Sequence, residues 1–270
     1  MVYWKRNFLN ATEAFRLATE FNQFRATWPE LRATAPQGDG HPVLIIPGFT
    51  ASDLPSYRLR RALREVGYNA YGWDGGVNTG LRNKTVEHLH SRLKEIYDEN
   101  GGQKVSLIGH SMGGIYARCL AHEFPDMVRD VITVGSPFGI GMNKGATPAL
   151  LVNTIQLLSN SKYSLKVAGM AERLLTPPDV PTTSIFSKMD GIAGWRACLN
   201  PKTRWSENIE VKSSHMGMIC NKDVLSILLD RLAQPEGAWK IYKNASKETP
   251  PPNPAWKPAA NSNWRLFPKP

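Results

Sequence analysis

A serine lies at the centre of the segment GHSMG at positions 109 to 113, directly after the apolar run Val105–Ile108. The run has the composition of a buried strand, and Met112–Phe124 has a helix-compatible pattern that ends before a proline. A sharp turn from strand to helix crowds the residues two positions away, so glycine at both ends of the segment removes Cβ atoms that would clash. This pattern is typical of a nucleophile elbow and makes Ser111 the candidate nucleophile, with an ordinary glycine-rich turn as the alternative.

A serine hydroxyl is a weak nucleophile at neutral pH, so Ser111 requires a histidine base and a carboxylate that orients the histidine. Of six histidines, only His215 follows the last predicted strand, in the loop KSSHMGM. Asp190 follows the preceding predicted strand, in the stretch MDGI. Both stand at the carboxyl edge of the predicted sheet, in the chain order Ser, acid, His. We expect His215 to be the base and Asp190 the acid, with Asp126 and Asp130 as alternative acids.

The tetrahedral intermediate of acyl transfer needs two hydrogen-bond donors for its oxyanion. Met112, the residue after the candidate nucleophile, supplies one backbone N–H. The second is expected from the loop after the first strand, where Gly48 allows the backbone to turn the N–H of Phe49 toward the same point. Phe49 and Met112 are therefore the predicted oxyanion donors.

Short apolar runs alternate with segments of helical spacing along the chain. The predicted strands are residues 43–48, 69–73, 105–109, 131–135, 182–186 and 208–211, and the predicted helices between and after them are residues 57–66, 85–100, 112–124 and 222–233. Strands that alternate with helices indicate an α/β fold whose central sheet is mostly parallel. The 270 residues are enough to bury a sizeable core without disulfides or metals.

The chain divides into three predicted regions. Residues 1–40 form an N-terminal helical segment, with an aromatic stripe over residues 10–28 that packs on the body or lies on a membrane surface. Residues 41–240 form the main domain, in which the stretch at about 139–181 is a helical lid or a longer crossover. Residues 241–270 are proline-rich and predicted to form an extended tail.

Six motifs together resemble small bacterial esterase/lipase-like α/β-hydrolases: PGFTASD, GWDGGVNTG, SLIGHSMGGIYAR, GSPF, MDGIAGW and SSHMGM. The resemblance covers residues 40 to 240 approximately. It implies the α/β-hydrolase fold with a sheet of about six strands, Ser111 as nucleophile, Asp190 as acid and His215 as base, with Phe49 and Met112 at the oxyanion hole. The chain differs from many lipases in having a proline where a histidine often precedes the oxyanion glycine.

Two aromatic residues are candidates for the substrate pocket. Trp73 lies in the glycine-rich loop after the second strand, and Phe138 follows the fourth strand. Both loops are expected at the edge of the sheet that carries the site. The alternative is that each ring packs in the core beneath its loop.

The chain carries 33 Lys and Arg against 23 Asp and Glu, a formal net charge of +10. Four arginines lie on the helix predicted at residues 57–66. They favour contact with an anionic membrane surface, and the alternative is a basic helix face exposed to solvent. No nucleic-acid-binding motif is present in the sequence. The odd number of cysteines predicts reduced thiols. Because no signal peptide or transmembrane run is seen in the sequence, we expect a cytoplasmic location, with peripheral contact with a membrane as a possibility.

These patterns predict a serine carboxylic-ester hydrolase that acts on a small-molecule or lipid ester without a cofactor or metal. An acyltransferase or thioesterase would use the same three residues with a different acceptor or leaving group. A protein with this fold that binds a ligand without catalysis is the alternative of another class. The oligomeric state is not indicated by the sequence.

Overall fold

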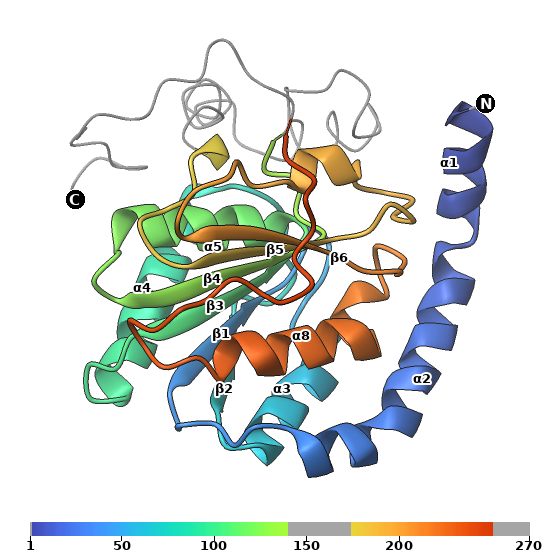
Figure 1. The fold of residues 1–270 in the computed structure, drawn as a ribbon. Coiled ribbons are helices and arrows are strands. Elements are labelled where there is room, and N and C mark those ends of the chain that lie inside the picture. Colours follow the sequence, from blue (N-terminus) through green and yellow to red (C-terminus); the bar gives the residue numbers. More distant parts are fainter. Residues whose placement is uncertain (1, 140–173, 251–270) are drawn as a thin grey trace.

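Six parallel strands form one sheet in the order β2-β1-β3-β4-β5-β6 in the computed structural model, which describes residues 2–139 and 174–250 (Figure 1). The strands are β1 Pro42–Ile46, β2 Asn69–Gly72, β3 Val105–His110, β4 Val128–Val134, β5 Thr182–Phe186 and β6 Ser206–Glu210. Every neighbouring pair is parallel. The predicted sheet of about six strands is confirmed.

The central strands are apolar because helices cover both faces of the sheet. Every residue of β1 is buried, and Val43–Ile46 are 0% exposed. A strand with one face in water would instead alternate apolar and polar residues. The continuous apolar runs that predicted the strands therefore reflect a sheet with two covered faces.

The helices divide between the two faces of the sheet (Figure 1). One face packs against α2 Glu13–Thr34, α3 Tyr57–Glu65 and α8 Lys222–Leu232. The other packs against α4 Asn83–Glu99 and α5 Met112–Glu123. Two short 3₁₀ helices, η1 Trp195–Cys198 and η2 Met218–Cys220, lie in the loops near the carboxyl edge.

The N-terminal stretch contains two helices, α1 Val2–Ala11 and α2, which runs along the outside of the body (Figure 1). In α2, Phe24 joins the hydrophobic core and Trp28 packs against it. The helix also buries two carboxylates, Glu13 and Glu20, which no hydrophobic stripe explains. Helix α2 continues past the predicted stretch to Thr34, where Leu31 packs against the core and Arg32 pairs with Glu65 of α3.

Several predicted features lie outside the described residues. The predicted lid at about 139–181 falls largely on residues 140–173, and most of the predicted tail falls on residues 251–270. Both remain predictions. Cys119, Cys198 and Cys220 are all buried free thiols. Among the helices of the described part of the chain, none combines the length and apolar character that crossing a membrane requires.

Candidate active site

Ser111 occupies a strained turn between β3 and α5. Its backbone has φ 52° and ψ −121°, in a region that residues with a side chain rarely adopt. A Cβ on Gly109 would lie 2.3 Å from the Cα of Gly114, and one on Gly113 would lie 2.1 Å from the carbonyl oxygen of Ile46. The glycines at these two positions are therefore required by the close approach of the backbone. Strain of this kind is typical of functional sites.

Asp190 and His215 form a buried hydrogen-bonded pair. The Nδ1 of His215 lies 2.7 Å from Oδ2 of Asp190, and both side chains are buried. The other oxygen, Oδ1, accepts the backbone N–H groups of Ile192 at 2.8 Å and Ala193 at 2.7 Å. The carboxylate is thus oriented on both sides, and it holds the imidazole with Nε2 free to face a third group.

The charge of Asp190 governs the titration of His215. Burial lowers the pKa of His215, but the negative charge of Asp190 and its hydrogen bond outweigh burial, so the net pKa lies above the ordinary value of 6.5. A base with a raised pKa accepts a proton more readily. This is the electrostatic arrangement that a serine nucleophile requires from its histidine.

Backbone contacts bring the loop of Ser111 together with the loops of the other two residues. The N–H of Ser111 donates to the carbonyl of Val134 at 2.9 Å. At the next residue, Gly135, a Cβ would lie 3.4 Å from Nδ1 of His215 and 3.5 Å from Oδ2 of Asp190. The three candidate residues therefore converge where β3, β5 and β6 end, around the end of β4.

His110 connects the elbow to the histidine loop. Its Nε2 lies 2.9 Å from the carbonyl oxygen of His215, and the two rings are 5.1 Å apart. Burial, together with the charge of His215, lowers the pKa of His110 to about 4. His110 is therefore neutral near pH 7 and donates this hydrogen bond without adding a positive charge. The sequence pattern identified no role for this residue.

Asn78 anchors the loop that carries the predicted donor Phe49. Its Nδ2 donates to the carbonyl of Pro47 at 3.0 Å, and its own carbonyl accepts the N–H of Thr50 at 2.8 Å. Asn78 is 0% exposed, so these bonds are shielded from water. The structure shows that it ties the loop after β2 to the loop after β1.

The oxyanion loop lies directly against the elbow. A Cβ on Gly48 would lie 3.0 Å from the Cβ of Ser111. Phe49 follows this glycine and is half-buried, whereas Met112 begins α5, where backbone N–H groups lack a partner within the helix. Both predicted donor positions thus flank Ser111, and the positive end of the α5 dipole lies beside it.

The two candidate pocket residues are both buried. Trp73 is 2% exposed, donates from Nε1 to the carbonyl of Gly76 at 3.0 Å and packs edge-on against His88. Phe138 is 2% exposed, and the guanidinium of Arg118 lies 4.0 Å from the centre of its ring. These contacts are those of the packing alternative, and the pocket role of both residues stays a prediction.

Asp130, one of the alternative acids, lies away from His215. It belongs to β4 and accepts the hydroxyl of Ser106 at 2.8 Å, and Ser106 in turn contacts Nε2 of His41 at 2.9 Å. In this second cluster of serine, histidine and aspartate, Ser106 and His41 are buried and Asp130 is half-buried. Within the described ranges, no group of three or more His, Cys, Asp or Glu side chains could hold a metal ion.

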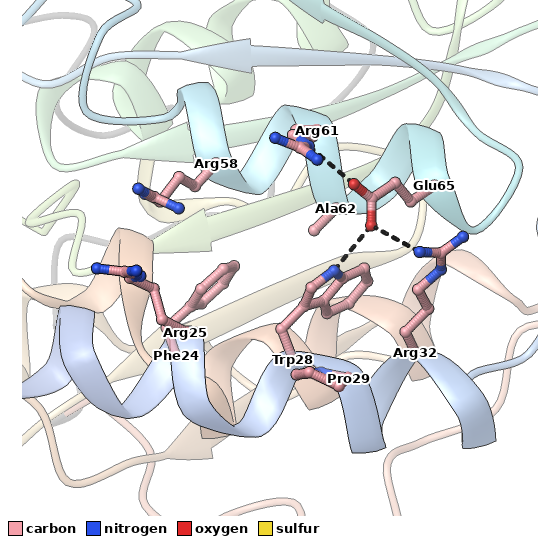
Figure 2. A pocket seen from close by; sticks show the side chains of 9 residues that line it. All are labelled: Phe24, Arg25, Trp28, Pro29, Arg32, Arg58, Arg61, Ala62 and Glu65. Carbon is pink, nitrogen blue, oxygen red and sulfur yellow. Dashed lines mark hydrogen bonds and ion pairs between the residues drawn. The ribbon is translucent and has the colours of Figure 1, made fainter.

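A groove of about 340 Å³ lies between α2 and α3 (Figure 2). Its lining residues are Phe24, Arg25, Trp28, Pro29, Arg32, Arg58, Arg61, Ala62 and Glu65. Glu65 accepts from Nε1 of Trp28 at 2.9 Å and forms ion pairs with Arg61 and Arg32. Figure 2 shows Arg25 and Arg58 at the other end of the groove, where no carboxylate of the described residues pairs with them. The groove is therefore basic at that end.

Comparisons with known proteins concern first the sequence around the elbow. Residues 41–150 match a family model described as alpha/beta hydrolase fold. A triacylglycerol lipase of Pseudarthrobacter phenanthrenivorans is 30% identical over 105 residues, which make up 36% of this chain and 33% of the lipase. The match thus spans about a third of the length of that lipase.

Two solved structures are similar over most of this chain. The monoacylglycerol lipase of Paleococcus ferrophilus has a TM-score of 0.54 at 18% identity and covers 74% of this chain and 96% of its own. Lipase B of Aspergillus fumigatus has a TM-score of 0.57 at 16% identity, and the match covers 76% of this chain and 56% of the lipase. At these identities the similarity concerns the fold alone.

Proposed function

Since the chain belongs to the α/β-hydrolase family and has lipases among its distant relatives, we propose that it is a serine hydrolase of carboxylic esters. Ser111 is the nucleophile, His215 the general base and Asp190 the acid that orients the base. The buried 2.7 Å bond between His215 and Asp190, beside the strained turn of Ser111, carries the proposal. The distant lipases support lipid esters as the substrate class.

The reaction proceeds in two halves through an acyl-enzyme. As Oγ of Ser111 attacks the ester carbonyl carbon, His215 takes the hydroxyl proton. The carbonyl oxygen becomes an oxyanion, which accepts hydrogen bonds from the backbone N–H groups of Phe49 and Met112. When the intermediate collapses, His215 gives the proton to the leaving alcohol. His215 then takes a proton from water as the water oxygen attacks the acyl carbon of the acyl-enzyme. When this second intermediate collapses, the bond to Oγ of Ser111 breaks, His215 returns the proton to Oγ, and the free acid leaves.

Asp190 acts through His215 in both halves. The imidazole becomes positively charged whenever it holds the serine or water proton, and the adjacent carboxylate stabilises that charge. The bond to Nδ1 also fixes the tautomer that leaves Nε2 as the base. The two backbone N–H groups on Oδ1 keep the carboxylate from rotating away from the ring.

A fluorophosphonate probe tests the nucleophile directly. The native protein and Ser111→Ala are compared for covalent labelling and for hydrolysis of p-nitrophenyl esters of increasing acyl length. We expect labelling only in the native protein and a loss of activity of about 10³-fold or more in the variant. A native protein that neither labels nor hydrolyses any ester contradicts the proposal and favours the ligand-binding alternative.

An acyltransferase or thioesterase would give the same labelling, because both form the same acyl-enzyme. Adding primary alcohols to the ester assay distinguishes them. Free acid as the main product supports hydrolysis, whereas a new ester at millimolar alcohol identifies a transferase. Faster turnover of the matched thioester identifies a thioesterase.

Contact with an anionic membrane surface is part of the proposal. The basic end of the groove, formed by Arg25 and Arg58, supports it (Figure 2). The other arginines of the helix at residues 57–65 contribute less than their number indicates, because Arg60 donates to the carbonyl of Asp53 and Arg64 to that of Ala70. Long-range attraction by the positive chain would concentrate it at an anionic lipid surface.

A further inference from the structure

Two buried carboxylates of α2 reach the loops that carry Asp190 and His215. Glu13 is 4% exposed and Glu20 is 8% exposed, although both belong to a helix that lies on the outside of the body (Figure 1). Carboxylates are rarely buried unless partners satisfy them. Four of their partners are backbone N–H groups of the two loops, and the others are side-chain donors.

Glu13 bridges the acid loop and the histidine loop. Its Oε1 accepts the backbone N–H of Gly191, the residue after Asp190, at 2.9 Å and that of His215 at 3.1 Å. Its Oε2 accepts the backbone N–H of Met216 at 3.0 Å. One side chain therefore connects both members of the pair through the backbone.

Glu20, two turns farther along α2, contacts the histidine loop alone. Its Oε1 accepts the N–H of Ser214 at 2.8 Å, and Oε2 accepts the Nδ2 of Asn221 at 3.1 Å and the hydroxyl of Ser213. Glu20 thus holds the loop from a second point. It does not reach the acid loop, which makes it a control for Glu13.

Arg16 completes the connection to the acid loop. It pairs with Oε1 of Glu13 at 2.8 Å and donates to the carbonyl of Met189, the residue before Asp190, at 2.8 Å. The Nδ2 of Asn10 donates to the carbonyl of Gly191 at 3.3 Å. The N-terminal helices therefore hold the backbone on both sides of Asp190.

We propose that Glu13 is a positioning residue that sets the distance between Asp190 and His215, so that the N-terminal helix is part of the active site. The inference rests on the proposed function for its catalytic meaning. It assigns a role to a segment that precedes residues 41–150, the part of the chain matched by the family model. Hydrogen bonds to ionised groups are stronger than neutral ones, and burial strengthens them further.

The charge of Glu13 also acts on His215. The groups that face His215 are Asp190 from the acid loop, Glu13 from α2 and neutral His110 from the elbow, with Arg16 paired to Glu13 behind it. Burial lowers the pKa of His215, and the charges of Asp190 and Glu13 raise it. Removing the charge of Glu13 must therefore lower the pKa of the base.

The test compares Glu13→Gln with Glu20→Gln and Glu30→Gln, an exposed position on the same helix. For Glu13→Gln we expect kcat to fall about 10-fold to 100-fold with KM changed less than 3-fold, because positioning acts on the transition state. The acid limb of the pH profile should move to lower pH by about half a unit or more, because a negative charge beside the base is lost. Glu20→Gln should lower the melting temperature without moving the limb, and Glu30→Gln should match the native protein.

Arg16→Gln is a second variant, for which we expect the pH profile to shift in the opposite direction. Removing the positive partner leaves the charge of Glu13 unscreened, so the acid limb should move to higher pH. If the limb stays in place in both Glu13→Gln and Arg16→Gln, or moves equally in Glu20→Gln, the positioning role is wrong and the contact is structural only.

An NMR titration of His215 separates this inference from the proposed function. The pKa of the imidazole is measured in the native protein and in Glu13→Gln without any substrate. A lower pKa in the variant supports the contact even if Ser111 fails to label with the fluorophosphonate, and an unchanged pKa overturns the inference even if it labels.

Discussion

Ser111 differs from Ser106 in its backbone conformation and in its exposure. Ser106 has a histidine and an aspartate within hydrogen-bond distance, yet it lies within β3, is 0% exposed and donates to Asp130. Ser111 lies at a positive φ, is half-buried and precedes a helix N-terminus. A nucleophile needs access and a site for the developing oxyanion, and of these two serines Ser111 is the one whose exposure and position before a helix N-terminus fit both needs.

The variant Asp190→Asn keeps the base His215 but removes the carboxylate that orients it, so it tests how much the orientation of the base contributes. The amide can bond to Nδ1 only by favouring the wrong tautomer or orientation, and it cannot stabilise the imidazolium. We expect kcat for ester hydrolysis to fall about 10³-fold to 10⁴-fold at pH 7. Because the charge that raises the pKa of His215 is lost, the acid limb of the remaining activity should move to lower pH.

The measurement is kcat/KM from pH 5 to pH 9 in both proteins, with circular dichroism to compare their folding. Asp179→Asn, just before β5, is the matched control and should behave as the native protein does. Retention of full activity by Asp190→Asn would assign the acid to another residue.

Asp130→Asn should change stability rather than activity. Burial raises the pKa of Asp130 from 3.8 to about 6, although the hydrogen bond from Ser106 opposes it. The folded state therefore binds more protons than the unfolded state between those values, so stability falls as pH rises from about 4 to about 6 and the penalty is complete above. Asparagine does not ionise, so the variant should lose this dependence.

Chemical denaturation at pH 5 and pH 8 measures the effect. We expect the free energy of unfolding of Asp130→Asn to exceed that of the native protein by on the order of 1 kcal/mol at pH 8, with a smaller difference at pH 5. Equal pH dependence in the two proteins would show that the carboxyl does not titrate as described. Ester hydrolysis should be unchanged, because Asp130 does not contact His215.

The loops after the strands act as a connected set. Asn78, in the loop after β2, holds the loop after β1, and His110, at the end of β3, holds the loop after β6. Both connecting side chains are neutral, whereas a charged side chain at these positions would shift the pKa of His215. The carboxyl edge of the sheet is therefore cross-linked by hydrogen bonds, which hold the predicted oxyanion donors and the proposed base in fixed positions relative to Ser111.

Asn78→Ala should loosen the oxyanion loop. The carbonyl of Pro47 and the N–H of Gly80 would lose their side-chain partners inside the protein. We expect a loss of about 1–3 kcal/mol in the free energy of unfolding and a fall in kcat of about 10-fold or more, because the N–H of Phe49 would no longer be held.

Denaturant unfolding and ester kinetics measure the two effects in one preparation. Asn69→Ala, which removes an exposed bond to Asn100 at the start of β2, is the control and should change neither quantity by much. A stable Asn78→Ala with native kcat would remove Asn78 from the site.

The charge of the protein is distributed unevenly over its surface. The formal net charge is +10, and the groove between α2 and α3 is lined by four arginines and one carboxylate, Glu65, which lies at one end (Figure 2). Of the two aromatic residues that line the groove, Phe24 belongs to the core and Trp28 packs against it. A surface of this kind fits an anionic lipid headgroup layer better than a neutral one.

Vesicle binding tests this surface. The protein should bind vesicles of phosphatidylglycerol but not of phosphatidylcholine, and binding should weaken as salt rises from 50 mM to about 500 mM. The double variant Arg25→Glu with Arg58→Glu should lose about 10-fold or more in affinity, since each basic residue near the surface contributes about 1 kcal/mol.

The control reverses the same number of charges elsewhere, at the exposed residues Lys243 and Lys247. If both double variants lose affinity equally, net charge alone accounts for binding and the groove has no special role. Hydrolysis of a water-soluble ester should be unchanged in either double variant, because none of the four residues contacts the site.

Local patterns in the chain were enough to predict the sheet and the candidate residues. Continuous Val, Ile and Leu runs indicate strands buried on both faces, and the crowding at a sharp turn demands glycine beside Ser111 whatever the rest of the protein does. Because parallel strands present their carboxyl ends at one edge, the order of Ser111, Asp190 and His215 along the chain was informative as well. These signals depend on neighbours a few residues apart.

The contacts that hold the site were not predictable in this way. Glu13 meets Gly191 across 178 residues and His215 across 202 residues, and its partners are backbone N–H groups, which every residue but proline carries. A backbone N–H donor cannot be identified from the residue type. Which acceptor it meets therefore depends on how the chain packs. The burial of Trp73 was likewise not predictable from local sequence, because it depends on where α4 packs. Sequence patterns thus identify the candidate groups for chemistry. The distances between these groups depend on how α2 and the loops pack, because such packing brings together residues that share no local pattern.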